Sequence, residues 1–260
     1  MLYRPCATSA NRGGIFLSAV QEAAATRGAG RKSQGGWLEW RVFNRLGLSA
    51  SSMSRLTVPD HQIGNPTFAI NIVVRPSPDV MQALVALQDR IEALAPAGTF
   101  HRVPAPTLHL SIFQLVWART QHVAIGPQEW LGLEADTFTA LQALASRYEP
   151  FVLHQGQVQV GDKAIYLQFS PSAAMDRLRD EIEHHARDRF PGRHRPQIQH
   201  ITLFRYQQAV PLAPLAHGCA QLPPWQQAWS IEQMELGQET AYPLLASRTV
   251  GNLALGSSET

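Results

Sequence analysis

Two stretches of sequence, LHLSIFQLVW (residues 108–117) and QHITLFRY (residues 199–206), decide how this chain is interpreted. Both are rich in the β-branched and aromatic residues that favour strands, and both follow a proline-containing turn. In each, a histidine and a hydroxyl residue two positions later interrupt one face of an otherwise apolar strand. Burying such groups without partners costs about 1–3 kcal/mol each, so the repeated interruption predicts one shared cleft.

The sequence around these two stretches predicts alternating strands and helices. Apolar residues at offsets of three and four indicate helices. Loosely alternating apolar and polar residues on both sides of a Gly-Asp turn indicate a hairpin. We expect further strands at residues 68–75, 151–160, 164–169 and 229–237, and helices at residues 80–94, 136–147 and 175–190. This order predicts two similar α/β lobes, each contributing one histidine-bearing strand.

Residues 1–60 differ from the rest of the chain. They are rich in Gly, Ser, Arg and Ala, lack sustained periodicity, and predict a flexible or poorly ordered extension ahead of a two-lobed domain at residues 61–260. The short apolar patch at residues 13–20 is cut off by Gln21-Glu22, which argues against a secretory signal. A weakly basic targeting segment is the alternative, and Met53 is an alternative natural start.

Composition narrows the classes of protein that fit. The chain has 260 residues, 45% of them apolar, and a formal net charge of +2, which suits a small anionic ligand as well as it suits RNA. Its two cysteines, Cys6 and Cys219, suggest neither a disulfide scaffold nor a zinc site, so we expect a cytoplasmic protein. The absence of a long apolar run predicts no membrane association, and no P-loop or dinucleotide fingerprint is present.

The histidine motifs are more specific than their spacing alone suggests. Of ten histidines, only His109 and His200 have Ser or Thr two positions later, and about one such triplet is expected by chance. In both copies the middle residue and the two that follow the hydroxyl residue are apolar. That requirement lowers the chance rate about tenfold per copy, and both copies meet it.

Strand alternation predicts which side chains share a face with the histidines. By this rule Arg205 points away from His200 unless the strand ends or bulges there. The predicted histidine faces carry His109, Ser111 and Phe113 in the first strand, and His200, Thr202, Phe204 and Tyr206 in the second.

The motifs TLHLSIF (107–113) and QHITLFR (199–205) resemble those of the two-histidine phosphoesterase superfamily. That superfamily includes the bacterial RNA 2′,3′-cyclic phosphodiesterases and the 2′-5′ RNA ligase-like proteins. The resemblance covers roughly residues 67–237 and implies an α+β, bilobal fold with antiparallel sheets, a pseudo-two-fold axis and a metal-free central cleft. Ser111 stands where threonine is commoner in the superfamily, but it also supplies a hydroxyl.

The resemblance implies hydrolysis of a 2′,3′-cyclic phosphate, on an RNA end or a small cyclic nucleotide, without metal or cofactor. Cleavage requires a base that activates water and an acid that protonates the leaving oxygen, and His109 and His200 suit these roles. Ser111 and Thr202 would bind the non-bridging phosphate oxygens. The sequence does not assign acid and base individually, and it leaves open a ligation reaction and the oligomeric state.

Weaker candidates have ordinary explanations beside the functional ones. Arg205 follows the second motif and is a candidate for neutralising the phosphate. Aromatic residues on the histidine face are candidates for stacking a nucleobase, with core packing as the alternative. These aromatic candidates are Tyr206, Phe113 and Phe204.

Two classes of function therefore remain. The first is the metal-independent cyclic phosphodiesterase. The second is a module on the same fold that binds RNA ends or a phosphorylated ligand without turnover.

Overall fold

The computed structural model describes residues 55–118 and 125–256. Residues 1–54, which make up most of the predicted N-terminal extension, lie outside the described residues. The strands of the described part are β1 (Pro66–Val74), β2 (Phe100–Arg102), β3 (Leu110–Val116), β4 (Phe151–Leu153), β5 (Gly156–Val160), β6 (Ala164–Phe169), β7 (His200–Tyr206), β8 (Trp229–Ile231), β9 (Gln233–Ala241) and β10 (Ala246–Ala254). The helices are α3 (Pro78–Glu92), α4 (Pro127–Ala145), α5 (Ala173–Ala186) and α6 (Leu212–Ala220), with a 3-10 turn at Ala105–Thr107.

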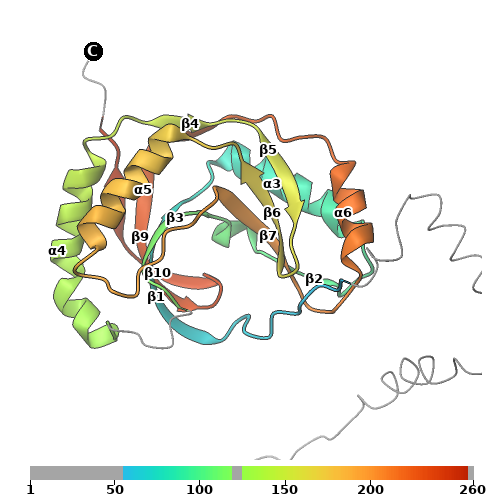
Figure 1. Cartoon of the computed structure of the whole chain (residues 1–260), viewed down its shortest axis with the longest axis horizontal. Helices are drawn as coiled ribbons and strands as arrows, with labels where there is room; N and C mark the ends of the chain where they lie inside the picture. The colour runs from blue at the N-terminus through green and yellow to red at the C-terminus, as the bar shows by residue number, and fades with distance from the viewer. Residues whose placement is uncertain (1–54, 119–124, 257–260) are drawn as a thin grey trace, which may run out of the picture. The chain divides into compact units, whose positions relative to one another are not determined.

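One antiparallel sheet runs through the described residues in the order β10-β9-β1-β3-β7-β6-β5, with β2 beside β7 and a separate β4–β8 pair. Its two histidine strands, β3 and β7, are neighbours, but they share a single register pair, Leu110 with Ile201. The sheet therefore divides at this short junction into two lobes, one built on β10-β9-β1-β3 and the other on β7-β6-β5 and β2 (Figure 1).

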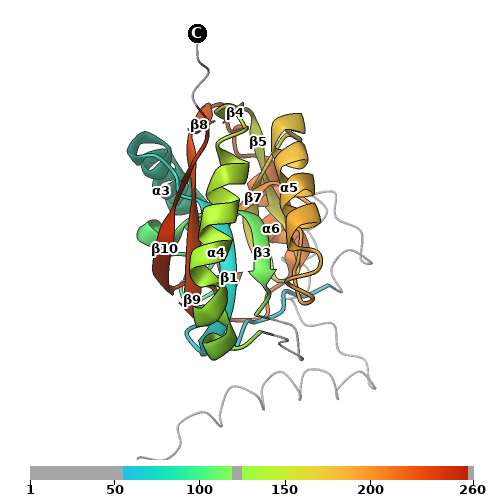
Figure 2. The ribbon, with the colours of Figure 1, turned by 90° about the vertical axis from the view of Figure 1, so that its left-hand side faces the viewer.

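Each lobe is covered by its own pair of helices. Helix α4 packs on β10 and α5 on β3, whereas α3 packs on β7 and α6 on β5. In Figure 1, α4 and α5 lie on the left of the described fold and α3 and α6 on the right, and Figure 2 looks onto the α4 side. Two helices cross between lobes, because α3 follows β1 but packs on β7, and α5 follows β6 but packs on β3.

The predicted two-lobed, antiparallel α+β architecture is confirmed, but the lobes are not successive halves of the chain. Strands β9 and β10 return from the C-terminal part and lie beside β1, so the first lobe combines early strands of the chain with its last two. Sequence patterns did not predict β2, α6 or β10, and they predicted β4 with β5, and β8 with β9, as single strands. Short or weakly patterned elements such as these depend on tertiary pairing more than on periodicity.

The core is made where the apolar stripes meet the sheet. Helix α3 buries Val80, Leu84 and Ile91 at helical spacing, and β1 buries an unbroken run from Ala69 to Val74. Leu94, which the sequence assigned to the same stripe, is 39% exposed because the helix ends at Glu92. No described helix has both the length and the apolar character needed to cross a membrane.

The boundary of the N-terminal extension needs correction. Residues 55–60, which the sequence assigned to it, pack on the two-lobed domain: Thr57 is 2% exposed and donates its backbone N–H to the carbonyl of Val210, at 2.9 Å. The backbone N–H of Asp60 also donates to the carbonyl of Tyr206. The folded domain therefore begins no later than residue 55 in the described part.

Close packing of α4 on β10 depends on Gly251. A Cβ at this position would lie 2.3 Å from Cε2 of Phe138. We therefore expect Gly251→Ala to lower the free energy of unfolding by about 1–3 kcal/mol, because the ring has to move. Urea denaturation measures the change. Gly132→Ala in the exposed face of α4, where a Cβ meets nothing within 4 Å, is the control and should be neutral or stabilising. Equal stability of Gly251→Ala and wild type would contradict this account.

Candidate active site

Each histidine strand contains an extra residue at the same place in its motif, and β3 has a further register shift after Gln114. In β3 the pairs Ile72–Phe113 and Val73–Ser111 leave Ile112 opposite no partner. In β7, Thr202 pairs with Tyr166 of β6 and Phe204 pairs with Ile165, so Leu203 between them has no partner in β6. Both extra residues stand three positions after the histidine. A bulge of this kind shifts the residues after it to the opposite face.

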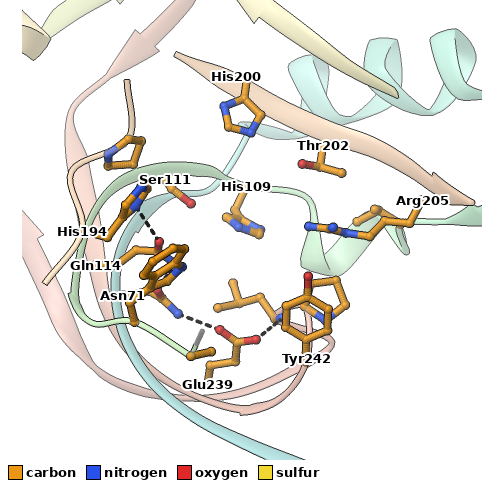
Figure 3. A pocket seen from close by; sticks show the side chains of 16 residues that line it. Asn71, His109, Ser111, Gln114, His194, His200, Thr202, Arg205, Glu239 and Tyr242 are labelled. Atoms are coloured by element: carbon orange, nitrogen blue, oxygen red, sulfur yellow. Dashed lines mark hydrogen bonds between the residues drawn. The ribbon is translucent and has the colours of Figure 1, made fainter. Parts of the chain in front are cut away.

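The bulges determine which side chains reach the pocket. From β3 and the residue before it, the pocket is lined by His109, Ser111 and Gln114. From β7 it is lined by the matching set His200, Thr202 and Arg205. Figure 3 shows the two histidines and the two hydroxyl residues pointing into the same space. The sequence prediction that the two motifs share a cleft is thus met by the geometry, and Arg205 faces the cleft because β7 bulges.

The three aromatic candidates for base stacking are corrected. Phe113, Phe204 and Tyr206 are each 0% exposed, and none of them lines the pocket. The bulge turns the two phenylalanines into the core, and the hydroxyl of Tyr206 donates to the carbonyl of Gly161 at 2.9 Å. These rings pack the core and have no face available to a nucleobase.

The pocket has a volume of about 320 Å³ and receives side chains from distant parts of the chain. Besides the two motif strands, it is bounded by residues of β1 and β9, by residues just after β2 and β3, by the segment before β7, and by the turn between β9 and β10. These further lining residues are Asn71, Val103, Trp117, Ala118, His194, Pro196, Glu239, Tyr242, Pro243 and Leu244.

His109 is held in one tautomer by the backbone. Its Nδ1 lies 2.8 Å from the carbonyl oxygen of Thr107, which can only accept, so Nδ1 carries the hydrogen. Nε2 is then the nitrogen that exchanges a proton with a ligand. Burial lowers the pKa of His109 to about 4 against the opposing effect of this hydrogen bond, and the positive charge of Arg75 adds to the lowering. The imidazole is therefore neutral at pH 7.

His200 has a related environment. Burial lowers its pKa, the carbonyl of Ile198 opposes this, and the charges of Arg179 and Arg205 lower the pKa further. The ring of Tyr166, on β6, meets the imidazole edge-on with the ring centroids 5.2 Å apart, which restricts its orientation.

Arg205 is oriented by an acidic residue from the segment before β1. Its Nη1 lies 3.1 Å from Oδ2 of Asp60, and both side chains are largely buried. The hydroxyl of Tyr242 donates to the same carboxylate oxygen at 3.3 Å, and the guanidinium lies over the Tyr242 ring, 5.4 Å from its centroid. Arg205 thus reaches the pocket with part of its charge balanced by Asp60.

Gln114, the counterpart of Arg205, is oriented by a chain of amides. The carboxylate of Glu239, 4% exposed, accepts from the backbone N–H of Leu244 at 2.9 Å and from Nδ2 of Asn71 at 3.0 Å. The Oδ1 of Asn71 in turn accepts from Nε2 of Gln114 at 3.0 Å. Because a carboxylate only accepts, it fixes the direction of both amide groups.

A third histidine ends this chain. Oε1 of Gln114 lies 3.0 Å from Nδ1 of His194, so Nδ1 of His194 must donate. The imidazole stacks on Trp117 with ring centroids 4.6 Å apart and planes at 17°. The pocket wall opposite Arg205 therefore presents a stacked pair of planar rings beside an amide side chain.

Sequence reasoning missed Asn71, Gln114, His194, Glu239 and Tyr242. One signal was present: Gln114 and Arg205 each stand five residues after a motif histidine, so the two motifs share a longer pattern than the one used. His194 gave no signal, because its partners Gln114 and Trp117 lie in or just after β3, and Gln114 is 80 residues away in the sequence.

The arrangement offers two imidazoles, two hydroxyls and one cation to a single small ligand. Such a set can transfer protons on two sides of a tetrahedral anion while donors hold its oxygens. Within residues 55–118 and 125–256, no three His, Cys, Asp or Glu side chains cluster as a metal site would require.

Comparisons with known proteins support the fold. No family model and no curated protein matches the chain. Among solved structures, TT0787 of Thermus thermophilus is 20% identical with a TM-score of 0.53, over 74% of this chain and 100% of that one. A phosphoesterase is 15% identical, TM-score 0.52, over 73% and 99%. LigT of E. coli, complexed with ATP, is 15% identical, TM-score 0.51, over 74% and 100%. The chain has the fold of these proteins, so the predicted two-histidine phosphoesterase fold is confirmed.

Acidification should destabilise the folded chain partly through His109. Between its unfolded pKa near 6.5 and its folded pKa of about 4, the unfolded chain binds a proton on this imidazole and the folded chain does not. The contribution of His109 is full above about pH 6.5 and is lost as the pH falls toward 4. Between pH 7.5 and pH 5, urea denaturation should show His109→Gln losing about 1–2 kcal/mol less than wild type.

The exposed His154 provides the matched control for this titration. His154→Gln should lose stability in parallel with wild type over the same pH range. If His109→Gln also follows wild type, burial of a neutral imidazole at position 109 is not the cause of the acid loss.

Proposed function

We propose that this chain, which has the two-histidine phosphoesterase fold, is a metal-independent phosphodiesterase that opens a 2′,3′-cyclic phosphate. One observation carries the proposal: two matching sets of an imidazole and a hydroxyl, from two neighbouring strands, line the same pocket. The substrate is an RNA end or a small cyclic nucleotide. With two cysteines in the whole chain, we place the reaction in the cytoplasm.

The mechanism follows from in-line displacement at phosphorus. A base takes a proton from water as its oxygen attacks phosphorus, one ribose P–O bond breaks, and an acid gives a proton to the leaving oxygen. The carbonyl of Thr107 holds the Nδ1 hydrogen of His109, so Nε2 is the nitrogen that takes the proton, which favours His109 as the base and leaves His200 as the acid. Ser111 and Thr202 donate hydrogen bonds to the two non-bridging oxygens, where negative charge grows in the transition state.

The two walls of the pocket differ in chemical character, which supports a substrate with unlike ends. Arg205 brings a cation to the His200 side, while Gln114 and the stacked pair of His194 and Trp117 bring an amide and planar rings to the other side. A nucleotide matches this difference, because its phosphate is anionic and its base is planar and uncharged. The volume of about 320 Å³ lies at the lower end of the range for small-molecule sites and suits one nucleotide unit.

The bound ligands of similar structures are consistent with a nucleotide. E. coli LigT has been crystallised with ATP and, in a structure that is 17% identical with a TM-score of 0.50, with NADP+. Both ligands contain nucleotides, and this supports the same ligand class here.

The second candidate, binding without turnover, is favoured by one observation. The pKa of both imidazoles is lowered, so the free protein at pH 7 has little protonated histidine to serve as the acid. A bound phosphate anion raises the pKa of a nearby imidazole and so restores an acid in the complex. The pH dependence therefore separates the candidates: an enzyme gives a bell-shaped rate profile that needs both histidines, and a binder loses affinity gradually.

Hydrolysis of 2′,3′-cyclic nucleotides and of an RNA oligomer ending in a cyclic phosphate tests the proposal directly. With EDTA present, we expect wild type to turn over at least one substrate, and His109→Ala and His200→Ala to reduce kcat/KM by at least about 100-fold each. His154→Ala, at an exposed site, is the control. Binding of phosphorylated ligands without any turnover would favour the second candidate, and activity that disappears with EDTA would refute metal independence.

Removing either motif hydroxyl should affect the transition state more than the ground state. Ser111→Ala and Thr202→Val are each expected to lower kcat by about 100-fold with a smaller change in KM, since the lost donor serves developing charge. Steady-state kinetics on the best substrate measure this effect. Thr139→Val, on the exposed side of α4, should leave both constants unchanged. A rise in KM alone would show that the hydroxyls only hold the ligand.

A further inference from the structure

Arg179 lies behind the pocket and is bound to the backbone of both motif segments. It belongs to α5 and is 0% exposed. Its Nη2 donates to the carbonyl of Ser111 at 2.9 Å and to that of Ile198 at 3.3 Å, and its Nε donates to the carbonyl of Ile112 at 3.1 Å. The guanidinium thus joins the bulge of β3 to the segment that leads into His200.

A cation in this position is costly, and its environment does not offset that cost with an ion pair. Buried charges in proteins are normally paired with an opposite charge. In the part of the chain that the structure describes, no carboxylate lies within 4.0 Å of the Arg179 guanidinium, and Nη1 has no hydrogen-bond partner. An apolar side chain would fill the same space more cheaply. What Arg179 adds is the set of backbone contacts.

Gln88 occupies the matching position in the other lobe. It lies on α3, the helix that packs on β7, and is also 0% exposed. Its Nε2 donates to the carbonyls of Leu203 and Val103, both at 2.9 Å, and its Oε1 accepts from Nε of Arg102 at 3.2 Å. Leu203 is the bulge residue of β7, as Ile112 is that of β3. In each bulge, the carbonyl of the extra residue therefore accepts a hydrogen bond from a buried polar side chain of the helix packed behind the strand.

We propose that Arg179 and Gln88 are positioning residues that hold the two bulges and so keep the motif histidines and hydroxyls aligned on one ligand. The consequence for catalysis rests on the proposed function. A bulge interrupts the regular ladder of hydrogen bonds, and buried carbonyls at the interruption need donors. Arg179 supplies one to Ile112, and Gln88 supplies a second donor to Leu203, which also accepts from the backbone N–H of Val103 at 3.0 Å. These donors stabilise the bulged form, in which Gln114 and Arg205 face the pocket.

Arg179 differs from Gln88 because it also connects the two lobes. The histidine strands share only the pair Leu110–Ile201, so the junction between the lobes is short. The contacts of Arg179 with Ser111, Ile112 and Ile198 add a second connection beside it. Loss of that connection changes the separation of the two imidazoles, and misplacement of catalytic groups by about 1 Å can reduce rates about 100-fold.

The charge of Arg179 has a separate effect that the test must isolate. The groups that face His200 are Arg179 on α5, Arg205 on its own strand, Tyr166 on β6 and His109 beside β3. Lysine at position 179 keeps the positive charge but cannot reach three carbonyls from a planar fork. Arg179→Lys therefore changes the geometry and retains most of the electrostatics.

The kinetic test uses Arg179→Lys and Gln88→Met, with the exposed Arg177→Lys on the same helix as control. We expect kcat to fall at least about tenfold in both test variants, with KM within about threefold of wild type and no change in the control. A folded Arg179→Lys that keeps wild-type kcat, however destabilised, overturns the proposal. If that variant does not fold, Gln88→Met, which leaves no buried charge behind, decides in the same way.

A spectroscopic test needs no substrate. In proton–carbon spectra of histidine-labelled protein, assigned with His109→Gln and His200→Gln, Arg179→Lys should move the imidazole signals of both residues. Gln88→Met should move mainly the signal of His200, and Arg177→Lys should move neither. Unmoved signals in Arg179→Lys overturn the proposal even if wild type is active. Moved signals support it even if wild type hydrolyses nothing, in which case the proposed function alone fails.

Discussion

The site depends on one extra residue in each of two neighbouring strands. In a regular strand the side chains two and five residues after a histidine lie on opposite faces, because the alternation has a period of two. The bulges at Ile112 and Leu203 remove that conflict, so each strand presents an imidazole, a hydroxyl and a longer polar side chain on one face. Without them Gln114 and Arg205 would point into the core and the two phenylalanines into the pocket.

The two bulges mark the point in each motif up to which the sequence predicts the side-chain directions correctly. Alternation over three residues is reliable, so the sequence correctly brings the histidines and hydroxyls to one pocket. The prediction fails at the fifth residue of each motif, counted from the histidine, where Phe113 and Phe204 enter the core instead of the cleft. Neither Ser-Ile-Phe nor Thr-Leu-Phe contains the glycine that often marks a bulge, so the cause lies outside the strand, in the helices packed behind it.

The parts of the pocket that come from remote segments carry no local signal at all. Glu239 reaches the site because β9 pairs with β1, and Asp60 because residues before β1 fold back to Arg205. Both pairings join positions more than 140 residues apart. Composition made residues 55–60 look like part of an extension, since a six-residue segment with few apolar residues shows no periodicity even when its backbone is fully engaged.

The two acidic residues explain how the pocket can favour an anion without a large positive charge. Asp60 balances part of the charge of Arg205, and the carboxylate of Glu239 lines the opposite wall, so the pocket carries no strong positive field. Both imidazoles are neutral at pH 7 in the free protein, because burial lowers their pKa. Attraction for a phosphate then comes chiefly from aligned donors, namely the hydroxyls and the guanidinium face. Donors held at fixed positions recognise the shape of a phosphoryl group, whereas a net field attracts any anion. This is why a net charge of +2 gave no indication of the site.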